Sequence, residues 1–350
     1  MKLARTTKVA LRVSLSLVLS MVIVELFHLP YALWVFFVAT STAAGSLGLS
    51  IQRSWQRAVM TVAGSLVGGG LHLLVQEARW ADQTLFAIAL FFAIYYLPYS
   101  YTLFLFFTAL LFVATSGLQE ALTLYALLMR IVDTLVGAGC ALLASLVIFP
   151  MRASDLLRTH LAGLITLSQR RLHLLNQAFL TQHPDKEEIS AVEEEQRTLF
   201  EKAHKALEEK RYERIFGNFF PRNGGLLLTQ LDHLANLLRG LTYTVQRRTS
   251  LLALQATRPE LEAYSELVER EFELPLTFLK TRKKKEMEDT GEIIRRRILI
   301  SILALPPPDK EHSRQWLNYH TYLHYLVRIE HLVGQLSNNS LSLSSLKDKQ

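Results

Sequence analysis

Residues 57–68 read RAVMTVAGSLVG, and residues 130–141 read RIVDTLVGAGCA. Both stretches follow one template, in which an Arg is followed at fixed spacing by a Thr, a Gly and a second small residue. The template positions are Arg57, Thr61, Gly64 and Gly68 in the first copy, and Arg130, Thr134, Gly137 and Ala141 in the second. Because small residues four apart let membrane helices approach closely, we assign the last two positions of each copy to helix packing.

Composition divides the chain near residue 150. Half of the 350 residues are hydrophobic, yet only eight Lys or Arg and five Asp or Glu fall within residues 1–150. The remaining 200 residues carry the other 30 basic and 26 acidic side chains. This shift predicts a transmembrane domain over 1–150, a cytoplasmic helical domain over 151–337 and a disordered tail over 338–350.

The apolar segments predict six membrane crossings in an all-α fold. A helix needs about 20 apolar residues to cross a bilayer. No charge occurs between Asp82 and Glu120, which is too long a stretch for one crossing, and Pro98 near its middle predicts a tight helical hairpin. The predicted spans are 9–27, 31–50, 57–75, 83–97, 100–117 and 130–149.

The Lys and Arg distribution orients these spans. Basic residues cluster before the first span, between the second and third, and after the sixth, which places both termini in the cytoplasm. We expect a multi-pass protein of the bacterial inner membrane. The two template copies then run in opposite directions, as in a 3+3 inverted repeat, although common glycine-packing chemistry alone would also explain them.

The template arginines are the first candidates for contacts with a substrate. An arginine fork binds a carboxylate bidentately, so Arg57 and Arg130, with Thr61 and Thr134, predict an organic-anion site. Two plainer explanations stay open: Arg57 extends to lipid headgroups at a cytoplasmic helix start, and Arg130 pairs with an acid three residues on. The candidates for proton coupling are Glu25, which a solvated helix end also explains, and Asp133.

At these residues the chain resembles a known family. The stretches LPYALWVFFVATSTAAGSLGLSIQRSWQRAVMTVAGSLVGG and MRIVDTLVGAGCALLASLVIFPMRASDLL are similar to spans of the fusaric acid resistance (FUSC) and aromatic acid exporter family. The second also resembles plant aluminium-activated malate transporters, a related group of anion channels. The resemblance implies a six-span unit with a cytoplasmic helical domain. Many family members carry two such units, so this single unit implies a homodimer.

The second half of the sequence predicts an antiparallel helical bundle. Its first helix ends at His183-Pro184-Asp185, NGG at 223–225 begins a helix that runs to about Ala256, and Arg258-Pro259 opens the next. Nucleotide-binding and hydrolase motifs are missing from the sequence, and its single Cys rules out a cysteine-rich metal site. We therefore expect no enzyme activity, no cofactor, no bound metal and no nucleic-acid partner.

Together these patterns predict an exporter or permease for organic, including aromatic, carboxylate anions, driven by an ion gradient. Its partners would be the lipid bilayer, a second copy and the anion, and a periplasmic adaptor protein stays open as a further one. A gated anion channel of the same fold, or an envelope scaffold protein that transports nothing, are the alternatives.

Overall fold

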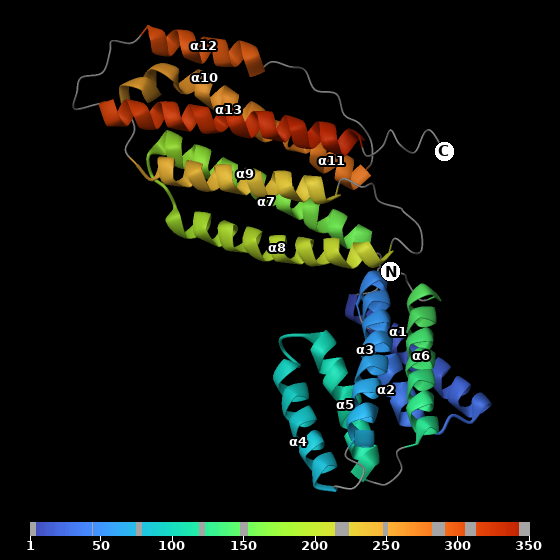
Figure 1. Cartoon of the computed structure of the whole chain (residues 1–350). Helices are drawn as coiled ribbons and strands as arrows, with labels where there is room; N and C mark the ends of the chain where they lie inside the picture. Colours follow the sequence, from blue (N-terminus) through green and yellow to red (C-terminus); the bar gives the residue numbers. More distant parts are fainter. Residues whose placement is uncertain are drawn as a thin grey trace. The chain divides into compact units, whose positions relative to one another are not determined.

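The computed structural model describes residues 5–43, 45–74, 79–118, 123–147, 153–213, 224–247, 251–281, 291–304 and 313–342. Every regular element within those ranges is an α-helix, which confirms the predicted all-α fold. The chain forms two compact units (Figure 1). Unit 1 is Met1–Ala153 with Glu209–Gly217, and unit 2 is Ser154–Glu208 with Asn218–Gln350.

The helices of unit 1 match the predicted apolar segments in number and order. Three of them are long and apolar enough to cross a membrane, and the other three are shorter apolar helices. The pair on either side of Pro98 forms the predicted helical hairpin (Figure 1). The bounds are α1 Arg5–Phe27, α2 Ala32–Thr42, α3 Leu47–Leu74, α4 Arg79–Tyr96, α5 Tyr101–Leu118 and α6 Leu124–Val147.

The α2–α3 boundary differs from the prediction, which placed one span over 31–50 and the next from residue 57. The backbone at Gly45 has a φ of +95°, a left-handed conformation that ends α2 early. The hydroxyl of Ser46 then accepts a hydrogen bond from the Leu49 N–H at 3.1 Å and caps α3. Arg57 therefore lies about 15 Å along α3, at 1.5 Å per residue, and not at the start of a helix.

The two template glycines make equivalent close contacts with two different helices. A Cβ added to Gly64 would lie 2.6 Å from the backbone oxygen of Phe106 on α5. A Cβ added to Gly137 would lie 2.8 Å from the backbone oxygen of Val35 on α2. In each case the next contact is three residues further along the partner helix, at Ala109 and Val38. Each template helix thus packs on the second helix of the other half of the repeat: α3 packs on α5, and α6 packs on α2. This reciprocal packing supports the inverted repeat.

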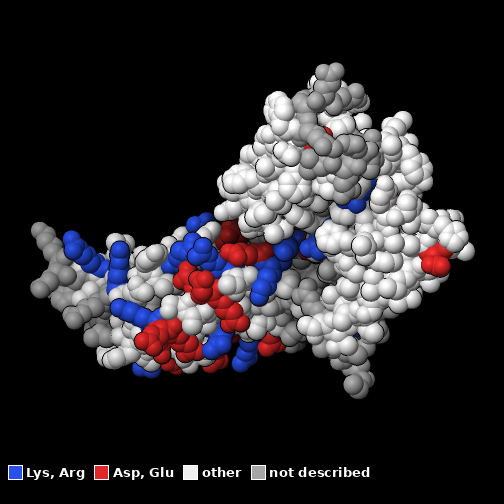
Figure 2. All heavy atoms as spheres, turned by 90° about the horizontal axis from the view of Figure 1, so that it is seen from below, with Lys and Arg blue, Asp and Glu red and all other residues white. Residues whose placement is uncertain are grey.

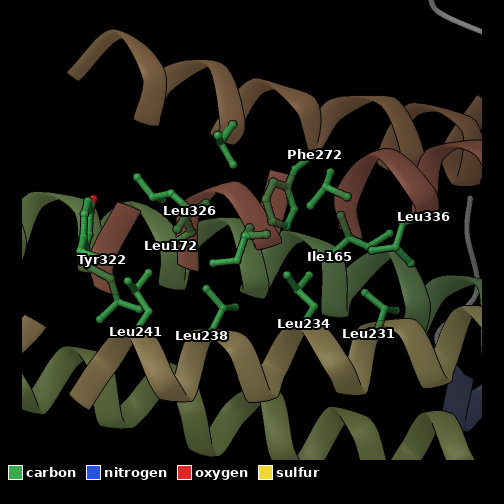
Figure 3. Packing of buried hydrophobic residues seen from close by; sticks show 14 of the residues in the cluster. Ile165, Leu172, Leu231, Leu234, Leu238, Leu241, Phe272, Tyr322, Leu326 and Leu336 are labelled. Carbon is green, nitrogen blue, oxygen red and sulfur yellow. The ribbon is translucent and has the colours of Figure 1, made fainter. Parts of the chain in front are cut away.

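Unit 2 contains seven helices within the described ranges, the first and second of which begin or end in unit 1. They enclose a leucine-rich core to which α7, α9 and α13 contribute facing rows (Figure 3). The bounds are α7 Ala153–Thr181, α8 Lys186–Glu213, α9 Gly224–Val245, α10 Leu251–Glu271, α11 Glu273–Thr281, α12 Gly291–Leu303 and α13 Ser313–Ser342.

Three helix boundaries of unit 2 differ from the prediction. The third helix of the bundle ends at Val245, not near Ala256, and Pro259 lies inside α10. Leu254 and Leu261, on either side of the proline, are both buried, so packing keeps this segment in one helix. Likewise, α13 runs to Ser342, five residues into the predicted tail, because Leu336 and Ser337 are still buried. Residues 343–350 lie outside the described part of the chain.

Charged groups are arranged differently in the two units. The visible face in Figure 2 shows Lys, Arg, Asp and Glu intermingled over unit 2 and few charges over unit 1. Inside unit 2, the Tyr264 hydroxyl donates a hydrogen bond to the buried Glu330 carboxylate. Burial, together with that hydrogen bond, raises the pKa of Tyr264 above its ordinary value, so the phenol stays a donor.

Candidate functional site

Arg57 is buried in the middle of α3, with 1 % of its surface exposed. Its Nε donates a hydrogen bond to the Tyr101 hydroxyl on α5 at 3.1 Å. Its guanidinium carbon lies 5.1 Å from the ring centroid of Phe37 on α2, within the range of a cation–π contact. One terminal nitrogen, Nη1, has no hydrogen-bond partner among the described residues. The headgroup explanation for this arginine is therefore wrong, because the side chain points into unit 1.

Arg130 on α6 is held between two aromatic rings. Its guanidinium carbon lies 2.9 Å from the ring centroid of Trp34 on α2 and 4.0 Å from that of Phe112 on α5. The side chain is 4 % exposed, and its Nε has no hydrogen-bond partner in the described structure. Both template arginines thus contact both α2 and α5, one helix from each half of the repeat.

Thr134 holds the Trp34 ring in place against Arg130. Its hydroxyl donates to the backbone oxygen of Arg130 at 2.8 Å and accepts from the indole N–H of Trp34 at 3.1 Å. The ring that covers Arg130 is therefore held by the next template residue of the same helix. Thr61, the equivalent residue on α3, is also buried.

Asp133 adds a carboxylate to the site. It is fully buried, and neither carboxylate oxygen has a hydrogen-bond partner within the described ranges. Its charge interacts through space with that of Arg130, which also experiences the charge of Arg57. The predicted pairing of Arg130 with Asp133 is thus an electrostatic interaction without a hydrogen bond.

The predicted site residues separate into those that the fold brings together and one that it does not. Arg57, Arg130, Asp133 and Thr134 are all buried where α2, α3, α5 and α6 pack. Glu25 is exposed near the end of α1, as its solvated alternative predicts. The packing residues Gly64, Gly68, Gly137 and Ala141 are all buried, and the first three leave no room for a Cβ.

Sequence reasoning missed the aromatic side chains around the arginines. Phe37, Trp34, Phe112 and Tyr101 stand in apolar segments where aromatic residues usually face lipid. No spacing in the sequence shows which arginine each ring meets, because the pairs join different helices. The only available signal was the density of aromatic residues in LPYALWVFF, which covers 29–37.

Comparison with known protein families gives two matches. Residues 19–144 match the family "Fusaric acid resistance protein-like". Residues 96–337, more than half of the chain, match the family "Putative ER transporter, 6TM, N-terminal". No curated protein matches the chain. The six transmembrane segments in the second description agree with the six helices of unit 1.

Proposed function

Because the chain belongs to the six-transmembrane transporter family of the longer match, within the FUSC group of membrane transporters, we propose that it exports organic carboxylate anions. Aromatic carboxylates are included in the proposed substrate class. The single observation that carries this proposal is the pair of buried, incompletely bonded arginines from opposite repeat halves, each against aromatic rings.

The energetics of buried charge support an anion as the missing partner. A charge taken out of water is costly unless it is paired and hydrogen-bonded. Arg57 and Arg130 carry two positive charges, and within the described residues one buried carboxylate, that of Asp133, interacts with Arg130. An incoming carboxylate would supply acceptors for the free N–H groups and balance the second charge. The flat rings beside the arginines would suit a planar acid.

Asp133 is the group that we propose for ion coupling. A buried carboxylate that lacks hydrogen-bond donors within the described structure can take up a proton or a cation at a low structural cost, and it would change the charge next to Arg130 by one unit. Transport driven by an ion gradient fits a sequence that carries no nucleotide-binding motif.

We also propose the membrane arrangement. The excess of Lys and Arg on one side of the spans supports a cytoplasmic location for both termini, and we propose a bacterial inner membrane and a homodimer as the setting. A cysteine replacing Gln83 should then react with an impermeant thiol reagent from outside the cell. Labelling of that cysteine only after permeabilisation would contradict the orientation. Cell fractionation distinguishes the cell membrane from the endoplasmic reticulum named in the family description.

Flux into proteoliposomes tests the function. We expect saturable, pH-driven uptake of one or more acids from a panel of aromatic and aliphatic carboxylates. Large currents that follow voltage would instead establish a gated channel, and no flux with any acid would leave a scaffold role. Arg130→Gln should abolish saturable uptake, whereas Arg297→Gln, which changes an exposed arginine on α12, should transport like the unmodified protein.

A further inference from the structure

The last turn of α8 belongs to unit 1 and packs against the start of α3. It contributes two buried carboxylates, those of Glu209 and Glu213, which are 8 % and 9 % exposed. The Ser46 hydroxyl donates to Glu209 Oε2 at 2.5 Å. A Cβ added to Gly48 would lie 2.2 Å from the backbone oxygen of Glu209, so only glycine permits this approach. The turn is therefore fitted closely to the beginning of α3.

One oxygen of Glu213 joins the start of α3, in the first half of the repeat, to the start of the helix that follows the second half. Its Oε1 accepts hydrogen bonds from the backbone N–H of Gly48 at 3.2 Å and from that of Ala153 at 2.6 Å. Gly48 is the second residue of α3, and Ala153 is the first residue of α7, which follows α6 in the chain. Both N–H groups are helix-start donors without a partner inside their own helices, and both helix starts attract negative charge.

The opposite end of unit 1 has a contact of its own between the halves. His72, in the last turn of α3, and Asp82, in the first turn of α4, approach to 3.0 Å. In this structure the halves are thus bonded to each other at both ends. A transporter that exposes its site to one side at a time must break such bonds at one end while it keeps them at the other.

We propose that the Glu209–Glu213 turn is a latch that closes unit 1 at the end where α3 begins, and that it releases during transport. This inference deepens the proposed function and rests on it. The two halves separate at this end only when Glu213 gives up at least one of its two backbone donors. Because Gly48 and Arg57 share α3, release of the latch frees the end of the helix that leads to the buried arginines.

Cysteine accessibility in proteoliposomes tests the latch without any substrate. The reporter is Ser54→Cys, a buried position on α3 between the latch and Arg57, in a Cys140→Ala background. Glu213→Ala removes the shared acceptor, and we expect about tenfold faster labelling by a thiol reagent. Glu213→Gln keeps an acceptor oxygen but loses the charge, so it should give a smaller increase. Glu208→Gln, which changes the exposed glutamate directly before the latch turn, should leave the labelling rate at its original value.

A second reporter, Ser116→Cys near the His72–Asp82 end, separates opening from unfolding. We expect its labelling rate to stay unchanged in the Glu213 variants. Equal increases at both reporters would mean general loosening and would overturn the latch, as would an unchanged rate at Ser54→Cys. Ser46→Ala, which removes only the bond to Glu209, gives a milder test should Glu213→Ala not fold. A normal latch response in a protein without carboxylate flux would overturn the proposed function alone.

Discussion

Two kinds of buried arginine are present in this protein, and their surroundings differ. In unit 2, Arg171 is 1 % exposed and bonds through its terminal nitrogens to Gln196 at 3.3 Å, Glu193 at 2.9 Å and Thr242 at 3.2 Å. In unit 1, Arg57 and Arg130 are buried to a similar degree, but both pack against aromatic rings. Arg57 also donates one hydrogen bond, to the Tyr101 hydroxyl.

This difference separates a structural charge from a candidate functional one. Arg171 makes three side-chain hydrogen bonds that connect α7 with α8 and α9, so its charge is used inside the fold. All three arginines leave one N–H without an acceptor among the described residues, but only Arg171 makes a hydrogen bond to a carboxylate, that of Glu193. Within the described residues, Arg57 bonds to a phenol and Arg130 contacts aromatic rings, so neither buried charge is hydrogen-bonded to an acid. Substitutions at Arg171, Arg130 and Tyr101 test whether this distinction holds, and one at Gly137 tests the helix packing around the unit 1 arginines.

The largest effect should come from Arg171→Ala. It removes three hydrogen bonds, leaves the Gln196 side-chain oxygen without this donor and opens a cavity, so we expect a loss of about 3 kcal/mol in the free energy of unfolding. Thermal unfolding in detergent measures it. The control is Arg170→Ala, the exposed neighbour paired with Glu188, which should cost less than about 1 kcal/mol. If Arg171→Ala also lowered the apparent affinity for the anion per folded protein, the distinction would be wrong.

Next in size is Arg130→Lys. Lysine keeps the charge but loses the planar fork, so we expect apparent affinity for the anion to fall about ten- to a hundredfold, or about 1.5–3 kcal/mol. Arg57→Lys should impair transport less, because Arg57 is not held between two rings as Arg130 is. Flux per folded protein is the measurement.

The double change Arg130→Gln with Asp133→Asn is the companion experiment. It removes both charges, so no unpaired charge stays buried and the protein should fold. We expect no transport, because the guanidinium that binds the anion is missing. Recovery of full transport would show that Arg130 serves only to balance Asp133.

A smaller effect is expected from Gly137→Ala. The new Cβ would lie 2.8 Å from the Val35 backbone oxygen, so α6 and α2 must shift, at a cost of about 1–2 kcal/mol in stability. Gly139→Ala, two residues on, meets nothing within 4 Å and should be neutral or slightly stabilising. Equal melting temperatures of the two variants would argue against close helix packing at the template glycine.

The smallest effect should be that of Tyr101→Phe, which removes the acceptor of the Arg57 Nε hydrogen bond but keeps the ring. We expect about a threefold to tenfold change in apparent affinity. The direction is informative: tighter binding would mean that the hydroxyl competes with the substrate for Arg57, and weaker binding that it positions the guanidinium. No change at all would remove Tyr101 from the site.

The sequence predicted the fold more closely than it predicted the site. Apolar runs and the Pro98 hairpin predicted the helices of unit 1, because hydrophobic length is a direct consequence of the bilayer. The template glycines also revealed helix packing. The break at Gly45 was missed because the small, uncharged residues on both sides read as one continuous span. The rings around Arg130 were missed because they lie on helices other than that of the arginine. Pro259 suggested a helix start that the structure does not have, because the packing of buried leucines outweighs its helix-breaking tendency.

The shortness of α2 has a consequence for how the protein enters a membrane. Its 11 residues are about 16 Å long, roughly half the thickness of the hydrocarbon core. The α2 helix must therefore end inside the hydrocarbon core of the bilayer. A backbone oxygen without a hydrogen bond is costly at that depth. The Arg12 guanidinium of α1 donates a hydrogen bond to the backbone oxygen of Gly45 at 2.7 Å. During synthesis, α2 therefore depends on a neighbour already in place, and we expect it to insert as a pair with α1 and not as an independent span.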